Sequence, residues 1–302
     1  MAARLEHVPS TFTSKGSTNS AIKIQHGYVS AHARRLRGSE IVFDRITVTG
    51  TENLIMAAVL AEGETILYNT ACEPEVVDLA DLLRSMGAKI EGDGSNRIRI
   101  QGVGKLRGTT HTIIPDRIET GSFLVAGAVT GGEIEVKRCR ADHLTAVIEK
   151  LEEAGVVVEK RSLEHLKVSA PREIQSVDAD TLEYPGFATD MQAQYVALMT
   201  QGNGTSIITE NIFENRFMHA SEMVRMGANI RIEGNRAIVI GKTKLTGAKV
   251  IASDLRASAS LVIAGLVAEG ETLIDRVYHL DRGYERIETK LRALGADVRR
   301  IS

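Results

Sequence analysis

The sequence repeats one pattern of residues roughly every 70 positions, and this repeat limits what the chain can fold into. A glycine-containing turn leads into a short apolar stretch at 61–69, 130–138, 201–209 and 268–276. A charged amphipathic stretch follows each time and ends at a glycine, namely Gly87, Gly155, Gly227 and Gly295. The spacing exceeds that of the common solenoid repeats, so we interpret each unit as a whole module of the βαβαββ type.

Hydrophobic periodicity assigns layers to this module. The helices expected at 54–61, 123–129, 193–199 and 259–268 are apolar nearly all round, which predicts that they are buried. The strands expected at 98–101 and 230–233 alternate polar with apolar residues and should bury one face only. The pattern indicates an α/β fold with helices inside and half-exposed sheets outside. The four glycines that end the amphipathic helices should adopt the left-handed conformation.

The repeat also divides the chain into three parts. Residues 1–40 form a lead-in, in which the Ser/Thr/Gly-rich stretch 9–20 is expected to be flexible and Ile22–Leu36 to form strands. Residues 41–114 contain one module and residues 115–302 contain three. We therefore predict a single module of an incomplete domain, followed by a three-module domain.

Composition excludes several classes of protein. Of the 302 residues, 43% are hydrophobic, which is enough to build cores, but no apolar stretch is long enough to cross a bilayer. No secretory signal is visible, which favours the cytoplasm. A net charge of −2 gives no reason to expect binding to nucleic acid or membrane. Two Cys and eight scattered His lack metal-ligand spacing, so no metal site is expected.

Charged and hydroxyl residues open each module, directly before the apolar helix. They lie at 44–48, 115–120, 188–191 and 253–256. The start of a helix can hold a phosphate or carboxylate through its free N–H groups, and a nearby Arg adds a bidentate clamp. Alternatively, the Asp and Thr residues are simply helix N-caps. The sequence leaves both interpretations open.

Asp190 is the most suggestive of these residues. It lies in a turn before a helix that carries Gln192 and Gln194, and a carboxylate at such a position could be a general base. Two further stretches, 213–219 and 278–284, are dense in polar and aromatic residues, and Arg282 beside Gly283 could face an anion. The alternative for both is a surface loop with weak salt bridges.

Five stretches in this order resemble the bacterial UDP-N-acetylglucosamine 1-carboxyvinyltransferases: DRIETG at 116–121, FATDMQAQ at 187–194, FENRFMH at 213–219, DLRASAS at 254–260 and YHLDRGYERIE at 278–288. The resemblance runs from about Ile22 to Ser302. It implies an inside-out α/β barrel with six modules in two domains. It also implies transfer of the enolpyruvyl group from phosphoenolpyruvate to the 3′-hydroxyl of UDP-N-acetylglucosamine, without a cofactor. That reaction is the first committed step of peptidoglycan synthesis, hence of cell wall biogenesis, cell shape and cell division.

The resemblance also carries over individual site residues. Asp190 matches the carboxylate at the sugar hydroxyl, Arg256 and Arg282 match arginines that hold phosphoenolpyruvate, and Glu73 matches an active-site acid. The matching substrate-binding positions are Arg45, Ile46, Thr47 and Val48 at the UDP diphosphate, Ile212 as a backbone contact to the nucleotide-sugar, and Arg216 in the cleft.

The chain departs from the family at its N-terminus. Family members carry there a Lys-Asn pair that holds phosphoenolpyruvate and a Gly-Cys loop with the proton-donating Cys; only 16–21 faintly matches the first of these. We therefore expect an N-terminally truncated member with little activity alone. One alternative is the 3-phosphoshikimate enzyme, which shares the fold. Another is a non-catalytic remnant that binds UDP-sugar weakly or pairs with a full-length paralogue. An incomplete domain would expose apolar helix surface, so self-association is also expected.

Overall fold

The computed structural model describes residues 21–26, 28–33 and 35–301. The chain divides into two compact units, Met1–Ile113 and Ile114–Ser302. The stretch 9–20, predicted to be flexible, lies outside the described residues. The strands predicted within Ile22–Leu36 are present as an antiparallel hairpin of β1 (Ala21–Gln25) and β2 (Tyr28–His32). The division of the chain into modules stays a prediction.

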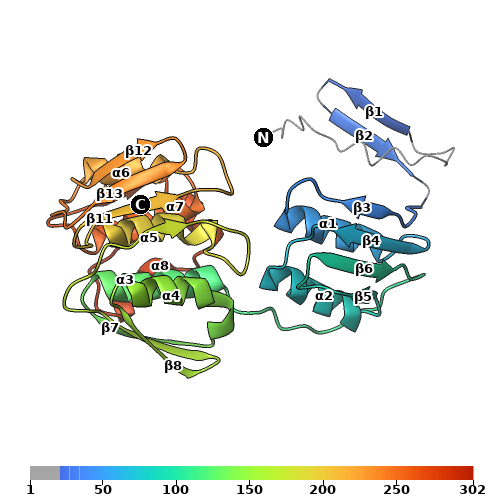
Figure 1. The fold of residues 1–302 in the computed structure, drawn as a ribbon, viewed down its shortest axis with the longest axis horizontal. Helices are drawn as coiled ribbons and strands as arrows, with labels where there is room; N and C mark the ends of the chain where they lie inside the picture. The colour runs from blue at the N-terminus through green and yellow to red at the C-terminus, as the bar shows by residue number, and fades with distance from the viewer. Residues whose placement is uncertain (1–20, 27, 34, 302) are drawn as a thin grey trace. The chain divides into compact units, whose positions relative to one another are not determined.

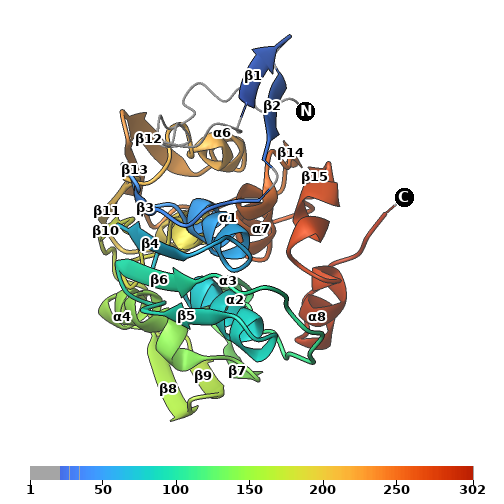
Figure 2. The ribbon, with the colours of Figure 1, turned by 90° about the vertical axis from the view of Figure 1, so that its right-hand side faces the viewer.

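The first unit contains one mixed sheet with two helices on one of its faces (Figure 1). The strand order is β3-β4-β6-β5, and Figure 2 shows these strands one above the other beside α1 and α2. The alternation predicted at 98–101 is confirmed, because Ile98 and Ile100 of β6 are fully buried between exposed neighbours. The elements are β3 (Glu40–Val42), α1 (Val48–Ala58), β4 (Glu64–Tyr68), α2 (Pro74–Ser85), β5 (Lys89–Glu91) and β6 (Arg97–Gln101).

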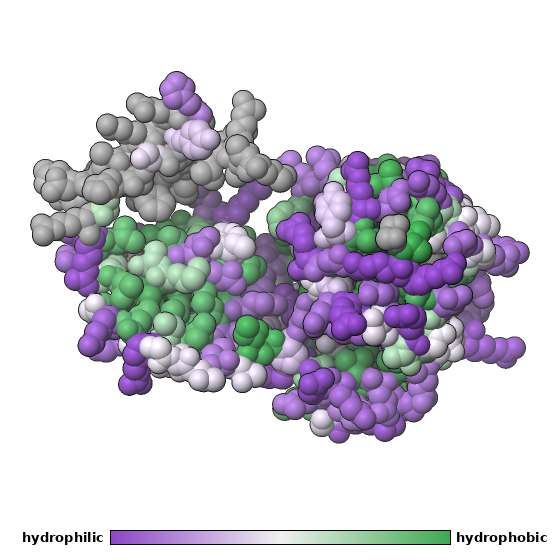
Figure 3. Space-filling view, turned by 180° about the vertical axis from the view of Figure 1, so that it is seen from behind, coloured by the Kyte–Doolittle hydropathy of each residue, from purple (hydrophilic) through white to green (hydrophobic). Residues whose placement is uncertain are grey.

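The prediction that the helix at 54–61 is buried all round is wrong. In α1 only Thr51, Ile55 and Ala58 are buried, whereas Met56 is 46% exposed and Leu60, just after the helix, is 44% exposed. Hydrophobic residues gather on the face of this unit that Figure 3 shows. An apolar sequence makes a helix able to be buried, but burial needs neighbours on every side, and among the described residues of this unit α1 packs against α2 and the sheet and leaves one face exposed.

The second unit contains the remaining elements. Its helices are α3 (Arg117–Val129), α4 (Thr145–Glu153), α5 (Gln192–Met199), α6 (Met218–Arg225), α7 (Leu255–Gly265) and α8 (Ile287–Ala293), with 3-10 helices η2 (Ala141–Leu144), η3 (Thr189–Met191) and η4 (Val277–Arg282). Its strands are β7 (Glu133–Lys137), β8 (Val157–Ser162), β9 (His165–Ser169), β10 (Ala179–Asp180), β11 (Thr205–Thr209), β12 (Asn229–Glu233), β13 (Arg236–Ile240), β14 (Lys249–Ile251) and β15 (Leu273–Asp275).

The strand orders reproduce the sequence repeat. The sheet β10-β11-β13-β12 has the same order as β3-β4-β6-β5, with one parallel pair followed by two antiparallel pairs in each. The sheet β7-β9-β8 matches the antiparallel part, and β14-β15 matches the parallel pair. Equivalent sequence positions therefore occupy equivalent places in these sheets.

Three helices pack against one another in the second unit, as the apolar stretches predict. Helices α3, α5 and α7 are in mutual contact. All residues of α5 are buried, as are most of α3 and α7. Their surroundings are apolar, with Leu124, Leu198 and Leu261 fully buried. The backbone N–H and C=O groups of the short segments next to these helices must therefore find hydrogen-bond partners close by, because the apolar surroundings offer none.

The glycine prediction is confirmed in both units. Gly87, Gly155, Gly227 and Gly295 have φ values of 103°, 87°, 93° and 99°. The next residue donates its N–H back into the last turn of the helix, as from Ala88 to the Leu83 carbonyl at 2.9 Å. Only glycine adopts this left-handed conformation without strain, so these positions end each amphipathic helix at the same place.

Candidate functional site

Three of the four module openings are N-caps. The Thr47 side chain accepts the Gly50 N–H at the start of α1. Asp116 accepts the N–H groups of Ile118 and Glu119 at the start of α3. Asp254 accepts those of Arg256 and Ala257 at the start of α7, both at 2.9 Å. For these residues the structural alternative from the sequence is confirmed, since their side-chain oxygens hold the ends of helices.

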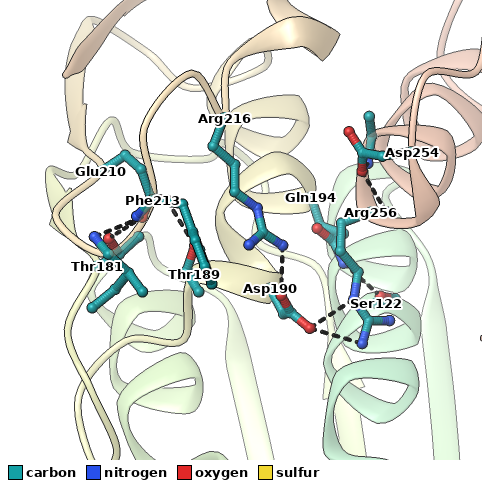
Figure 4. A network of polar contacts seen from close by, with 12 residues as sticks. Ser122, Thr181, Thr189, Asp190, Gln194, Glu210, Phe213, Arg216, Asp254 and Arg256 are labelled. Atoms are coloured by element: carbon teal, nitrogen blue, oxygen red, sulfur yellow. Dashed lines mark hydrogen bonds and ion pairs between the residues drawn. The ribbon is translucent and has the colours of Figure 1, made fainter. Parts of the chain in front are cut away.

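Asp190 differs from these caps because its carboxylate binds two arginines instead of backbone N–H groups. Arg216 Nη2 donates to Oδ1 at 2.6 Å. Arg256 donates to Oδ2 from Nε at 3.0 Å and approaches it with Nη2 at 2.9 Å (Figure 4). The three side chains come from η3, from the segment between β11 and α6, and from the first turn of α7. The structure thus brings together three of the residues predicted from the sequence.

This arrangement fixes the ionisation of Asp190. Burial by itself raises the pKa of the carboxyl, but the charges and hydrogen bonds of Arg256 and Arg216 outweigh it and hold the pKa below its ordinary value. Asp190 is therefore an anion at neutral pH. A carboxylate with a lowered pKa is a weak base, so two bound arginines oppose the role of general base in this geometry.

Arg256 is the more deeply placed of the two arginines. Its side chain is 14% exposed, against 24% for Arg216. Its Nη1 is buried and has no hydrogen-bond partner within the described part of the chain. The guanidinium lies over the Tyr284 ring, 5.6 Å from its centre, which adds a cation–π contact. Arg256 is thus held on two sides by protein groups.

A buried polar network lies beneath Arg256. Gln194 Nε2 donates to Ser122 Oγ at 3.1 Å and to Tyr284 Oη at 3.2 Å, and the two hydroxyls are 2.8 Å apart. Ser122 donates its own proton to the Ile118 carbonyl at 2.8 Å, so Tyr284 is the donor to Ser122. Burial raises the pKa of Tyr284, which keeps its hydroxyl protonated for this bond. The network joins α3, α5 and the segment after η4.

Removing the Tyr284 hydroxyl should destabilise this unit. Tyr284→Phe leaves Gln194 and Ser122 short of one partner each in a fully buried place, which typically costs about 1–3 kcal/mol. The measurement is the free energy of unfolding by urea denaturation. Tyr278→Phe is the matched control, because Tyr278 is 59% exposed and its loss of a hydroxyl should be nearly silent. Equal stability of the two variants would contradict the assignment.

Two other predicted residues of this unit, Ile212 and Arg282, form no hydrogen bond or ion pair with Asp190 in the described structure. The Ile212 N–H donates to Glu210 Oε1 at 2.9 Å, so a backbone contact from Ile212 to a ligand would use its carbonyl. Arg282 is exposed at the end of η4. Its role stays a prediction.

The remaining predicted residues lie in the first unit. Arg45 is exposed, and Ile46, Thr47 and Val48 are half-buried at the start of α1. Glu73 precedes α2, is 8% exposed, and has a buried Oε2 without a hydrogen-bond partner within the described residues. Its charge contributes to raised pKa values of Glu52 and Cys72, although burial is the larger cause for both.

Several residues that shape the site were not predicted individually, although His219 and Tyr284 lie in the polar and aromatic stretches 213–219 and 278–284. Glu210 is buried and accepts hydrogen bonds from two hydroxyls and two backbone N–H groups, yet in sequence it is one acid after a strand. His219 is buried, and burial lowers its pKa to about 4. Tyr284 and Ser122 are linked across 162 positions. Only the acidic end of a β-branched strand could have drawn attention to Glu210.

The described residues offer neither a metal site nor a membrane-spanning helix. They contain no group of three or more His, Cys, Asp or Glu side chains placed to hold a metal ion. None of their helices combines the length and the apolar character that a membrane span requires.

The sequence of this chain is similar to those of known carboxyvinyltransferases. A family model for EPSP synthase (3-phosphoshikimate 1-carboxyvinyltransferase) matches residues 15–291. A UDP-N-acetylglucosamine 1-carboxyvinyltransferase of Koribacter versatilis is 63% identical over 277 residues, covering 92% of this chain and 64% of the relative. One of Solibacter usitatus is also 63% identical over 277 residues, covering 91% of this chain and 66% of the relative. The chain thus spans just under two thirds of the length of these relatives.

Solved structures give the same grouping. The enolpyruvyl transferase NikO from Streptomyces tendae matches with a TM-score of 0.84 at 25% identity, covering 93% of this chain and 69% of that one. EPSP synthase from Acinetobacter baumannii matches with a TM-score of 0.70 at 20% identity, covering 92% of this chain and 68% of that one. The second likeness shows the fold alone. Together they confirm the α/β fold class.

Proposed function

Because this chain belongs to the EPSP synthase family of carboxyvinyltransferases, we propose that it acts in transfer of the enolpyruvyl group from phosphoenolpyruvate to the 3′-hydroxyl of UDP-N-acetylglucosamine. In this reaction a bond forms between the sugar oxygen and C2 of phosphoenolpyruvate. The bond from C2 to the phosphate oxygen breaks, and phosphate leaves. The methylene carbon C3 gains a proton as the sugar oxygen adds to C2 and loses one again as phosphate leaves, and the proton of the sugar hydroxyl leaves with the phosphate. The site must therefore supply a proton acceptor, a proton donor for C3 and cations for the anionic groups.

The observation that carries the proposal is the carboxylate of Asp190 between Arg216 and Arg256. A carboxylate next to two guanidinium groups combines an acceptor for a hydroxyl proton with cations for phosphate and carboxylate. Both substrates are anionic and would compete with Asp190 for the arginines. Moving even one arginine onto a substrate oxygen raises the pKa of Asp190 and makes it a stronger base.

The remaining predicted site residues would bind the substrates or act as an acid. Arg282 and Arg256 would hold phosphoenolpyruvate, and Glu73 would act as an acid. Arg45, Ile46, Thr47 and Val48 would contact the UDP diphosphate, and the Ile212 carbonyl would contact the nucleotide-sugar. The Thr47 side chain already occupies the Gly50 N–H at the start of α1, so a ligand there would be left the other N–H groups of the first turn.

The same relatives are the basis for a proposed architecture and a proposed cellular process. We propose an inside-out α/β barrel with four of the six modules of the family, and no cofactor. The process would be peptidoglycan synthesis in the cytoplasm, which supports cell wall biogenesis, cell shape and cell division. Neither nucleic acid nor membrane is a proposed partner.

Phosphate release tests the function directly. The purified 302-residue chain is mixed with phosphoenolpyruvate, with and without UDP-N-acetylglucosamine, and free phosphate is measured. Release that depends on the nucleotide-sugar supports the transferase. Calorimetric binding of UDP-N-acetylglucosamine without release, by a chain folded according to circular dichroism, supports the non-catalytic binder. Release that depends instead on shikimate 3-phosphate would identify the other transferase of this fold.

We also propose that the chain self-associates through α1 of the first unit and the residues just after it, where Met56 and Leu60 are exposed. Burying such side chains against a second copy removes apolar surface from water. Sedimentation velocity should show a concentration-dependent dimer that Met56→Glu weakens. The exposed polar control Thr49→Glu, on the same helix, should not weaken it. A monomer at all concentrations would contradict self-association.

A further inference from the structure

We propose that Glu210 is a positioning residue that holds both members of the Asp190–Arg216 pair in place. This inference goes beyond the residues predicted from the sequence, and its meaning for catalysis rests on the proposed function. Glu210 follows β11 directly and is 3% exposed. No lysine, arginine or histidine pairs with it in the described structure, so its buried charge depends on hydrogen bonds alone.

One side of the Glu210 carboxylate holds the segment that carries Arg216. Oε1 accepts the backbone N–H groups of Ile212 at 2.9 Å and Phe213 at 3.1 Å. The Phe213 ring in turn lies under the Arg216 guanidinium, 4.8 Å from ring centre to carbon. The carboxylate therefore fixes the backbone of the residue on which the arginine rests.

The other side of the carboxylate holds the segment that carries Asp190. Oε2 accepts the Thr189 hydroxyl at 2.8 Å, and Thr189 is the immediate neighbour of Asp190 in η3 (Figure 4). The Thr181 hydroxyl is the fourth donor to this carboxylate, at 3.0 Å to Oε1. One buried anion thus joins two segments that are otherwise connected through the Asp190–Arg216 contact at 2.6 Å.

Glu210 itself is anchored to the tight turn of a regular β-hairpin. Its N–H donates to the Asn235 carbonyl at 2.8 Å, and Asn235 Nδ2 donates to the Glu210 carbonyl at 3.1 Å. Asn235 lies in the turn between β12 and β13, which pair in register through their whole length. A residue held by a regular hairpin can define the position of side chains on neighbouring irregular segments more sharply than those segments can themselves.

The test measures the acidity of Asp190 and does not require catalysis. Aspartate labelled with ¹³C at the carboxyl carbon is incorporated, the Asp190 signal is identified by its absence in Asp190→Asn, and the signal is titrated. Thr189→Val replaces the hydroxyl with a methyl group of similar size, removes the hydrogen bond to Glu210 and should loosen η3 from it. We expect Asp190 to become a roughly tenfold weaker acid as its contact with Arg216 lengthens, because an opposite charge nearby is what lowers its pKa.

Matched variants separate positioning from general damage. Thr189→Ser keeps the hydroxyl and should restore the acidity seen in the parent. Glu210→Gln keeps an acceptor for the two N–H groups, and its amide can donate to the Thr189 hydroxyl, so it should lie between the parent and Thr189→Val. Thr205→Val, an exposed change on β11, is the control. Thermal unfolding confirms that every variant is folded.

Turnover gives a second readout. Thr189→Val should lower kcat about 10- to 100-fold, with a smaller change in KM, as expected when a reacting group is misplaced. An unchanged Asp190 titration in both Thr189→Val and Glu210→Gln overturns the proposal. If the titration shifts as expected but no chain, including the parent, releases phosphate, the positioning role stands and the proposed function fails.

Discussion

Asp190→Asn should lower nucleotide-sugar-dependent phosphate release by at least about a hundredfold, the usual contribution of a positioned proton acceptor. The substitution keeps the size of the side chain but removes the charge that both arginines contact. The loss should appear in kcat, because the amide cannot accept the proton of the sugar hydroxyl. Steady-state phosphate release at saturating substrates is the measurement.

A second signature distinguishes this effect from misfolding. Without the carboxylate, Arg216 and Arg256 lose their anionic partner and should bind inorganic phosphate more tightly than in the parent. Phosphate should therefore raise the thermal midpoint of Asp190→Asn more than that of the parent. Asp180→Asn, an exposed change in β10, should leave both properties as they are. Full turnover in Asp190→Asn would exclude Asp190 as the base.

The second large effect concerns pH and comes from His219. Burial lowers the pKa of His219 in the folded chain to about 4 from its ordinary value of 6.5, while Asp254 raises it and Arg216 lowers it further. Between these two pH values the unfolded chain binds a proton that the folded chain does not. Neutral His219 therefore makes its full contribution to the free energy of unfolding above pH 6.5. That free energy falls by about 3 kcal/mol as the pH falls from 6.5 towards 4.

Urea denaturation at a series of pH values measures this contribution. The comparison variant is His219→Leu, which has a similar volume and cannot titrate. The His219 Nε2 has no hydrogen-bond partner in the described structure, so an apolar replacement leaves no donor behind. The stability of the variant should depend less on pH between 6.5 and 4, whatever its absolute value. Parallel curves for the two proteins would show that folding does not lower the pKa of His219.

Much of the fold could be predicted because its signals are local. The four glycines end helices wherever a backbone must turn left-handed, a property of the residue itself. The alternation at 98–101 fixes which face of β6 is buried. The same alternation predicted at 230–233 is wrong, because β12 buries neither of its isoleucines and Ile232 is 42% exposed. Burial of α1 could not be predicted in this way, since its apolar residues do not specify what covers them.

The candidate site was predictable only in part. Asp190, Arg216 and Arg256 were identified through the family resemblance, whereas the residues alone left Asp190 open between a cap and a base. Asp116 and Asp254 open equivalent helices and cap them. Asp190 does not, because its carboxylate has stronger partners in two guanidinium groups from distant segments. Local sequence cannot distinguish these outcomes, as the competing partners lie 26 and 66 positions away.

The sequence by itself therefore determined the repeat, the helix ends and the apolar stretches that build the core, since each depends on neighbouring residues and on backbone preference. Only the tertiary structure decided which polar groups meet. It placed the Glu210 carboxylate between Thr189 and the backbone at Ile212, and Tyr284 beneath Arg256. A buried polar group must find its partners in three dimensions, and those partners are set by how helices and sheets pack.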